Sequence, residues 1–329
     1  MIKRYLLRPA IALLALMGLG GAILAAMIAQ PLVPPPPLAS IQQGAQKIDV
    51  KDAPPLSYFA ARDGTQIGYR AFEPQADAAA APVAILIHGS AGHSLNQVSI
   101  GKALAAAGVR AIAIDMRGHG VSGARGDVAY IGQSEDDLAD FLDHLKLAGK
   151  PAQKPVLVGF SMGGGFASRV AHSAMGARFS RFVLVSPFMG SDAPTSRPSS
   201  GEARWANVDL PRIVALSILH RAGVDCCGSL PVIAYGLPPE IQRYATTRYS
   251  FNLLSSFGPK DMRYRDLAGI DAPIAIIAGE KDELMVADRY AEIAKTASNA
   301  RAQVIPGVDH MGMARDPAAL AAIVAAVKG

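Results

Sequence analysis

Apolar residues in this sequence fall into short continuous runs that alternate with segments of helical spacing. Runs rich in Val and Ile, typical of parallel strands buried on both faces, occupy 83–87, 109–114, 156–160, 182–185, 274–278 and 302–305. Helical spacing predicts helices over 100–107, 132–147, 162–175, 286–297 and 317–327. A β-hairpin is expected around Asp63-Gly64, ahead of the first run. This alternation predicts an α/β fold: a mostly parallel, twisted sheet with helices on both faces.

The alternation stops between Phe188 and Ala272, where prolines are frequent and no buried-strand pattern is evident. Insertions of this length between sheet strands usually form functional lids, so we expect a lid over about residues 189–270. Its segment 210–224 predicts a helix with one broad apolar face. That face would line a substrate pocket, form a membrane-facing flap, or pack the lid onto the core.

The N-terminus predicts a membrane anchor. Residues 9–29 carry no charge and are long enough to cross a bilayer, which takes about 20 apolar residues. Lys3, Arg4 and Arg8 precede them, which predicts a cytoplasmic N-terminus and a folded domain on the outer, periplasmic side. The alternative is a cleaved signal peptide and secretion. We expect residues 1–30 to be the anchor or signal, 31–56 a stiff proline-rich linker, and 57–329 the folded domain.

Charge and cysteine content exclude several classes of function. Of the net charge of +5, the first 46 residues supply +3, so the folded domain is nearly neutral and no nucleic-acid surface is expected. Cys226 and Cys227 are adjacent in the sequence, an unfavourable geometry for a disulfide, and we interpret them as small side chains in the lid region. Cys-x-x-Cys and Cys/His ligand spacings are absent from the sequence, so we expect neither metal nor cofactor.

Candidate chemistry begins at Gly159-Phe160-Ser161-Met162-Gly163, directly after a predicted buried strand and before a predicted helix. A nucleophilic serine needs a sharp strand-to-helix turn, and glycines two residues to either side leave room for it. Ser161 is therefore the candidate nucleophile. A serine hydroxyl also needs a general base, and His310 follows the last predicted strand, at the carboxyl edge of the sheet.

The base must be oriented by an acid, and Asp282 follows the strand 274–278 in the chain order Ser, Asp, His. Glu280, Glu283 and Asp192 are the alternatives.

Donors for a developing oxyanion are expected at the backbone N–H groups of Ser90 and Met162. Ser90 lies in His88-Gly89-Ser90-Ala91-Gly92 after the first buried run, and Met162 begins the helix after Ser161. His88 is expected to brace this loop. The loop lacks the lysine and glycine spacings of phosphate-binding motifs.

The segment Asp115-Met116-Arg117-Gly118-His119-Gly120-Val121-Ser122 resembles the D-x-R-G-H-G-x-S signature of monoacylglycerol lipases and lysophospholipases. These belong to a lidded group of α/β-hydrolases that also includes prolyl-aminopeptidase-like enzymes. The resemblance extends over about 57–329 and is weak in the lid. It implies a Ser161–His310–Asp282 triad, an acyl-enzyme intermediate and oxyanion donation by Ser90 and Met162. We interpret Arg117 and His119 as structural residues.

The expected function is therefore serine hydrolysis of carboxylic esters, with a lysophospholipase- or monoacylglycerol lipase-like substrate. A small-molecule or lipid ester is the expected partner, and the sequence does not determine the oligomeric state. A prolyl-aminopeptidase-like alternative needs lid carboxylates for a substrate amino group; the candidates are Asp192, Glu202, Asp209, Asp225, Glu240 and Asp261. A second alternative is a non-catalytic, membrane-tethered binding protein.

Overall fold

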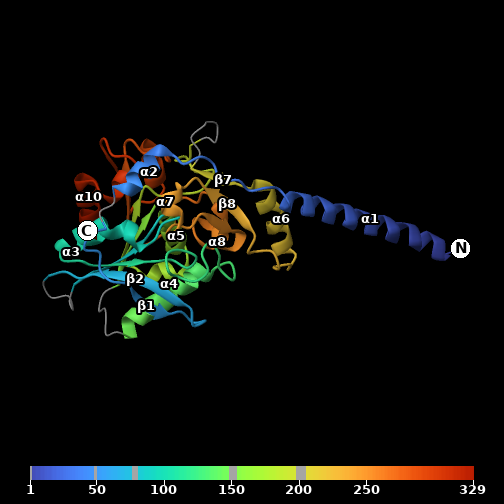
Figure 1. Cartoon of the computed structure of the whole chain (residues 1–329), viewed down its shortest axis with the longest axis horizontal. Helices are drawn as coiled ribbons and strands as arrows, with labels where there is room; N and C mark the ends of the chain where they lie inside the picture. The colour runs from blue at the N-terminus through green and yellow to red at the C-terminus, as the bar shows by residue number, and fades with distance from the viewer. Residues whose placement is uncertain (1, 48–49, 76–80, 148–153, 198–204) are drawn as a thin grey trace.

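The protein is built around a twisted sheet that lies between two layers of helices (Figure 1). The computed structural model describes residues 2–47, 50–75, 81–147, 154–197 and 205–329. Within these residues, eight strands form the main sheet in the order β1-β2-β4-β3-β5-β6-β10-β11. The hairpin strands β1 and β2 are antiparallel to each other, β2 is antiparallel to β4, and the remaining pairs are parallel. The predicted α/β-hydrolase fold is thus observed.

Strands β1 Ser57–Ala60 and β2 Gln66–Phe72 form the predicted hairpin around Asp63-Gly64. The other strands follow the predicted apolar runs to within two residues: β3 Val83–Ile87, β4 Arg110–Ile114, β5 Val156–Phe160, β6 Arg181–Val185, β10 Ile274–Gly279 and β11 Ala300–Ile305. The helices that flank this sheet are α3 Val98–Ala106, α4 Gln133–Leu147, α5 Met162–Ala171, α9 Tyr290–Ala294 and α10 Pro317–Lys328.

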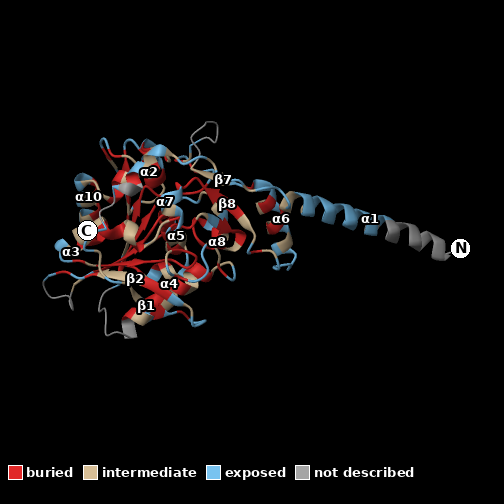
Figure 2. Ribbon diagram, in the orientation of Figure 1, coloured by how far each residue is buried: buried red, intermediate tan, exposed pale blue. Residues whose placement is uncertain are grey.

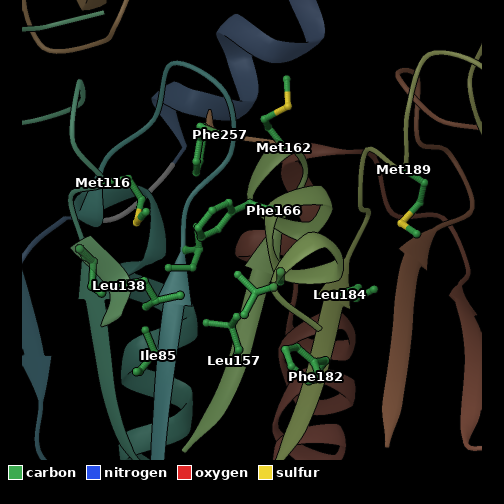
Figure 3. Close-up of a cluster of buried hydrophobic side chains, with 14 of the residues drawn as sticks. Ile85, Met116, Leu138, Leu157, Met162, Phe166, Phe182, Leu184, Met189 and Phe257 are labelled. Atoms are coloured by element: carbon green, nitrogen blue, oxygen red, sulfur yellow. The ribbon is translucent and has the colours of Figure 1, made fainter. Parts of the chain in front are cut away.

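Alternate residues of each central strand pack into different cores, one on each face of the sheet. Ile85 and Ile87 of β3 join the cluster that includes Phe166 of α5, which Figure 3 shows in close-up. Ala84 and Leu86 of the same strand join the opposite cluster, which contains residues of α3 and α10. Both faces of β3 are therefore buried, which explains its continuous apolar sequence. Figure 2 shows the buried interior of the body in red.

The lid lies between β6 and β10 and has a small sheet of its own, of order β7-β8-β9. Its elements are β7 Ala206–Val208, α6 Leu210–Arg221, β8 Pro231–Tyr235, α7 Pro239–Gln242, β9 Arg248–Ser250 and α8 Phe251–Ser256. The expectation that this region holds no buried strand was wrong. In β8, Val232 to Tyr235 are buried, because β7 and β9 pair on both of its edges.

The predicted helix in the lid forms, but its apolar residues do not share one buried face. Ala215 and Leu216 are buried, whereas Leu210, Val214 and Ile218 are largely exposed. Nearby, Cys227 is half-buried and Cys226 is exposed; both thiols are free and their Sγ atoms lie 3.0 Å apart.

Helix α1 (Ile2–Ile28) occupies the predicted anchor region and projects from the body beside α6 (Figure 1). A helix with the length and apolarity needed to span a membrane is not found among the described residues, contrary to the expected transmembrane helix. The outer location of the folded domain stays a prediction.

The proline-rich segment after α1 lies against the folded domain, although we expected a spacer. Asn207 of the lid donates a hydrogen bond from Nδ2 to the carbonyl of Val33 over 2.8 Å. Beyond the prolines, the unpredicted helix α2 (Ala39–Gln46) packs on the short helical turn Met311–Ala314.

We expect Phe166→Ala to lower the free energy of unfolding by about 3–5 kcal/mol, because Phe166 is fully buried and the change leaves a cavity between α5 and the sheet. Urea-induced unfolding followed by circular dichroism measures this change. Tyr58→Ala, at a residue that is 49% exposed on β1, is the control and should change stability far less. Equal losses in the two variants would contradict the assignment of Phe166 to the core.

Candidate active site

Ser161 lies at the turn between β5 and α5 in a conformation that L-residues rarely adopt. Its φ and ψ are 54° and −118°, and its N–H donates to the carbonyl of Val185 over 2.9 Å. Its own carbonyl accepts hydrogen bonds from the N–H groups of Gly164 and Phe188, each over 2.9 Å. This strain persists because the surrounding backbone fixes it, a pattern found at functional sites.

Glycines make the turn sterically feasible. A Cβ on Gly159 would lie 2.2 Å from the carbonyl oxygen of Gly163, and a Cβ on Gly163 would lie 2.3 Å from the carbonyl oxygen of His88. A Cβ on Gly89 would lie 3.0 Å from the Cβ of Ser161. Glycine is therefore required at these positions because backbone segments approach each other closely. The same close approach brings the loop after β3 against Ser161.

His310 and Asp282 form a buried pair at the carboxyl edge of the sheet. The Nδ1 atom of His310 lies 2.8 Å from Oδ2 of Asp282, and both side chains are at most 2% exposed. The other carboxylate oxygen of Asp282 accepts hydrogen bonds from the N–H groups of Leu284 and Met285, each over 2.9 Å. The carboxylate is thus fixed in place. Because it faces Nδ1, the Nε2 atom of His310 points away from Asp282.

Each member of this pair shifts the other's pKa. Burial alone would raise the pKa of Asp282, but the charge and hydrogen bond of His310 outweigh it and hold this pKa below its usual value. Burial would lower the pKa of His310, but the charge and hydrogen bond of Asp282 outweigh it and raise this pKa above its usual value. Asp282 therefore stays ionised at neutral pH and strengthens His310 as a base.

The carboxylates of the three alternative acids accept hydrogen bonds from backbone N–H groups instead. Glu280 accepts a hydrogen bond from the N–H of Gly307 over 2.6 Å, and Glu283 accepts one from the N–H of His310 over 3.0 Å. Asp192 accepts from the N–H of Tyr264 over 2.6 Å and pairs with Arg263. The geometry thus favours Asp282 as the partner of the His310 ring.

The proposed oxyanion donors come from two elements that meet at Ser161. Met162 is the first residue of α5, and Ser90 lies in the loop after β3. His88 braces this loop: its Nδ1 lies 2.8 Å from the carbonyl oxygen of Gly89, and its Nε2 accepts from the N–H of Met116 over 3.2 Å. Burial lowers the pKa of His88 to about 4, so the ring is neutral, as this pattern of donor and acceptor requires.

The lid also holds the loop after β3 that carries Ser90, the proposed oxyanion loop, through contacts that we did not predict from the sequence. Ala91 has a φ of 58°, and its N–H donates to the hydroxyl of Tyr249 over 3.0 Å. Its carbonyl accepts from the N–H of Thr246 over 3.1 Å. Burial lowers the pKa of His119 well below its usual value, so the neutral ring accepts at Nε2 from the Tyr249 hydroxyl, 2.5 Å away. The lid therefore fixes the backbone beside Ser90 on both sides of Ala91.

Arg117, in the same sequence signature as His119, is structural. Its guanidinium pairs with Asp137 over 2.7 Å and with Asp63 over 2.9 Å. These pairs tie the loop after β4 to α4 and to the hairpin.

A cavity of about 460 Å³ joins Ser161, His310 and Ser90, a size usual for small-molecule sites. Its other lining residues come mainly from the lid and the loops around the serine, and are mostly apolar: Ile41, Val50, Gly89, Ala91, Gly92, His93, Leu95, Asn96, Phe160, Trp205, Leu237, Ile241, Tyr244, Ala245, Leu284 and Met311. Helix α6, for which a pocket wall was one of the interpretations, contributes no residue to this lining in the described part of the chain.

No carboxylate lines this cavity among the residues that the structure describes. Of the lid acids considered for binding an amino group, Asp209 caps α6 and pairs with Arg212, while Asp225 pairs with His220. Asp192 pairs with Arg263, as above, and Glu202 lies outside the described residues. Across those residues, no three His, Cys, Asp or Glu side chains are grouped so as to hold a metal ion.

Comparison with known proteins agrees with this geometry. A family model described as "Serine aminopeptidase, S33" matches residues 78–317. The chain belongs to this α/β-hydrolase family. A monoacylglycerol lipase of Mycolicibacterium smegmatis is 28% identical over 262 residues, which is 77% of this chain and 88% of that protein. The chain is thus an esterase- or lipase-like α/β-hydrolase with distant homology to monoacylglycerol lipases.

Solved structures show the same fold at low identity. A soluble variant of monoglyceride lipase from Saccharomyces cerevisiae, in complex with a substrate analogue, has a TM-score of 0.61 at 17% identity, covering 86% of this chain and 96% of that one. Est1E from Butyrivibrio proteoclasticus with bound ferulic acid has a TM-score of 0.57 at 19% identity, covering 83% and 96%.

The raised pKa of His310 predicts the acid limb of the pH profile. A general base works only when neutral, so kcat/KM falls as the pH drops through this pKa. We expect the midpoint of the limb above about pH 6.5, the usual histidine value. Asp282→Asn should lower kcat and remove the electrostatic cause of the shift. A midpoint well below pH 6.5 in the unaltered enzyme would contradict the His310–Asp282 pair.

Tyr249→Phe should lower kcat about tenfold with little change in KM, because it leaves the Ala91 N–H unpaired beside the oxyanion loop. Steady-state kinetics with a water-soluble ester separates the two constants. Tyr130→Phe, which removes a hydroxyl bonded to Asp136, is the control and should leave kcat unchanged. A rise in KM alone would show that Tyr249 contacts substrate and does not position the loop.

Proposed function

We propose that this protein is a serine hydrolase that cleaves carboxylic esters with an apolar acyl group, of the monoacylglycerol lipase or lysophospholipase type. The observation that carries the proposal is the cavity at Ser161: its walls are mostly apolar, and no carboxylate lines it within the described residues. An acyl chain gains free energy from burial against such walls, about 0.8 kcal/mol per methylene.

The proposed chemistry proceeds through an acyl-enzyme. Ser161 Oγ attacks the ester carbonyl while His310 takes its proton, and the backbone N–H groups of Ser90 and Met162 stabilise the oxyanion. His310 then gives the proton to the departing alcohol as the C–O bond breaks. A water molecule attacks the acyl-enzyme, His310 takes the water's proton, and the proton returns to Ser161 as the acid leaves. Asp282 keeps His310 oriented and stabilises its charged form.

The aminopeptidase alternative has weaker support, although the family description carries that name. A free amino group carries a positive charge at neutral pH, and burying it without an anion is costly. The described lining of the cavity offers no carboxylate to pair with it. The non-catalytic alternative would leave unexplained both the strained turn at Ser161 and the buried pair of His310 and Asp282.

A substrate panel tests the proposal with the full chain. Monoacylglycerols, lysophospholipids, short soluble esters and N-terminal prolyl amides are compared, with Ser161→Ala as the blank. We expect hydrolysis of the apolar esters, negligible amide hydrolysis, and a loss of at least about 10³-fold in Ser161→Ala.

A fluorophosphonate label distinguishes the outcomes. It should modify the protein and fail on Ser161→Ala, and undiminished labelling of that variant would exclude Ser161 as the nucleophile. Labelling without hydrolysis of any apolar ester would reject the proposed substrate class and leave the nucleophile in place. Faster turnover of prolyl amides than of esters would favour the aminopeptidase.

A further inference from the structure

The cavity at Ser161 is completed by a segment far from the catalytic elements in sequence. Ile41 of α2 is only 4% exposed and lines the cavity together with His310 and Met311. We refer to residues 31–44, which run from the end of α1 across the lid to this point, as the N-terminal strap. No residue of the strap carries a charge.

The strap is held at several points along its length. Directly before the strap, Arg212 of α6 donates a hydrogen bond from Nε to the carbonyl of Ile28 over 2.8 Å and another to the carbonyl of Gln30. Asn207 of β7 bonds the carbonyl of Val33. A Cβ on Gly236 would lie 2.6 Å from the carbonyl oxygen of Pro36, so the prolines lie directly against the lid. These contacts hold the chain that precedes α2 against the lid.

At its other end the strap packs beside the catalytic histidine. Gly44 and Ile41 are both buried and lie one helical turn apart, on the same face of α2. A Cβ on Gly44 would lie 2.4 Å from the Cβ of Met311, the residue after His310. The absence of a side chain at Gly44 therefore lets α2 approach closely enough for Ile41 to reach the cavity.

We propose that Ile41 is a specificity-determining residue, and that the N-terminal strap forms one wall of the acyl site. In this arrangement the Ile41 side chain limits the space available to the acyl chain beside His310 and excludes water from it. The lid and strap act together, since Trp205 and Leu237 of the lid line the same cavity. This inference rests on the proposed function, in which Ser161 carries the acyl group.

Alkyl fluorophosphonates of two lengths, ethyl and decyl, test the wall without needing a known substrate. The readout is the ratio of their rates of reaction with Ser161 in the full chain. Ile41→Trp fills the site and should lower the decyl-to-ethyl ratio about tenfold, since one methylene more or less in an apolar pocket changes rates by about 10–200-fold. Ile41→Ala enlarges the site and should raise the ratio.

Gly44→Ala provides an independent variant. Alanine favours helix formation over glycine by about 1 kcal/mol, so α2 itself gains stability. The added methyl group nevertheless collides with Met311 and displaces α2, so the ratio should rise as it does for Ile41→Ala. Gln43→Ala, on the exposed face of the same helix, is the matched control and should keep the unaltered ratio.

Ratios within twofold of the unaltered protein in both Ile41→Ala and Gly44→Ala would overturn the proposal, as would an equal shift in Gln43→Ala. If Ile41→Trp reacts with neither label because it fails to fold, the two smaller substitutions decide. Normal labelling of the unaltered protein without ester hydrolysis would reject the proposed function alone, and the ratios would still measure the wall.

Discussion

The left-handed backbone at Ser161 is the constraint around which the rest of the site is arranged. It requires glycines at 159 and 163, because a side chain at either would meet backbone atoms well inside van der Waals distance. It also requires a rigid support, which the doubly buried strand β5 and helix α5 provide. A strained residue of this kind costs of order 1–3 kcal/mol, and the buried clusters on both faces of the sheet offset that cost.

Two parts of the sheet bring further residues to this turn. The loop after β3 approaches Ser161 within van der Waals contact and brings Ser90 to the cavity, while β10 and β11 end beside it and deliver Asp282 and His310. The lid then bonds both sides of Ala91, so it fixes the oxyanion loop as well as covering it. The same lid therefore encloses the cavity and fixes the loop beside Ser161.

The sequence predicted the α/β-hydrolase fold, and it predicted residues that the structure brings together at the candidate site: Ser161, Asp282 and His310. Strands such as β3 are continuous apolar runs, and the order of the serine, the acid and the histidine follows from where those runs end. The lid strand β8 was missed because four buried residues after a proline, in a proline-rich region, give too short a signal. Tyr249 was missed because its role arises from tertiary contacts with Ala91 and His119 that no local pattern encodes.

The packing of the N-terminal strap against the folded domain was not predicted, for a related reason. Consecutive prolines are typical of extended spacers, and Ile41 is a single large apolar residue among the small and polar residues of α2. The contact of α2 with Met311 and the burial of Ile41 show that this helix packs against the folded domain.

The strap brings together segments that are far apart in the sequence, because Ile41 and His310 line the same cavity and Ile41 is synthesised well before His310. During translation the contact between α2 and Met311 can therefore form only after β11 and the loop that follows it have left the ribosome. Contacts so distant in sequence form late, since the entropy of closing a long loop opposes them. The turn at Ser161 can therefore form before α2 closes its side of the cavity.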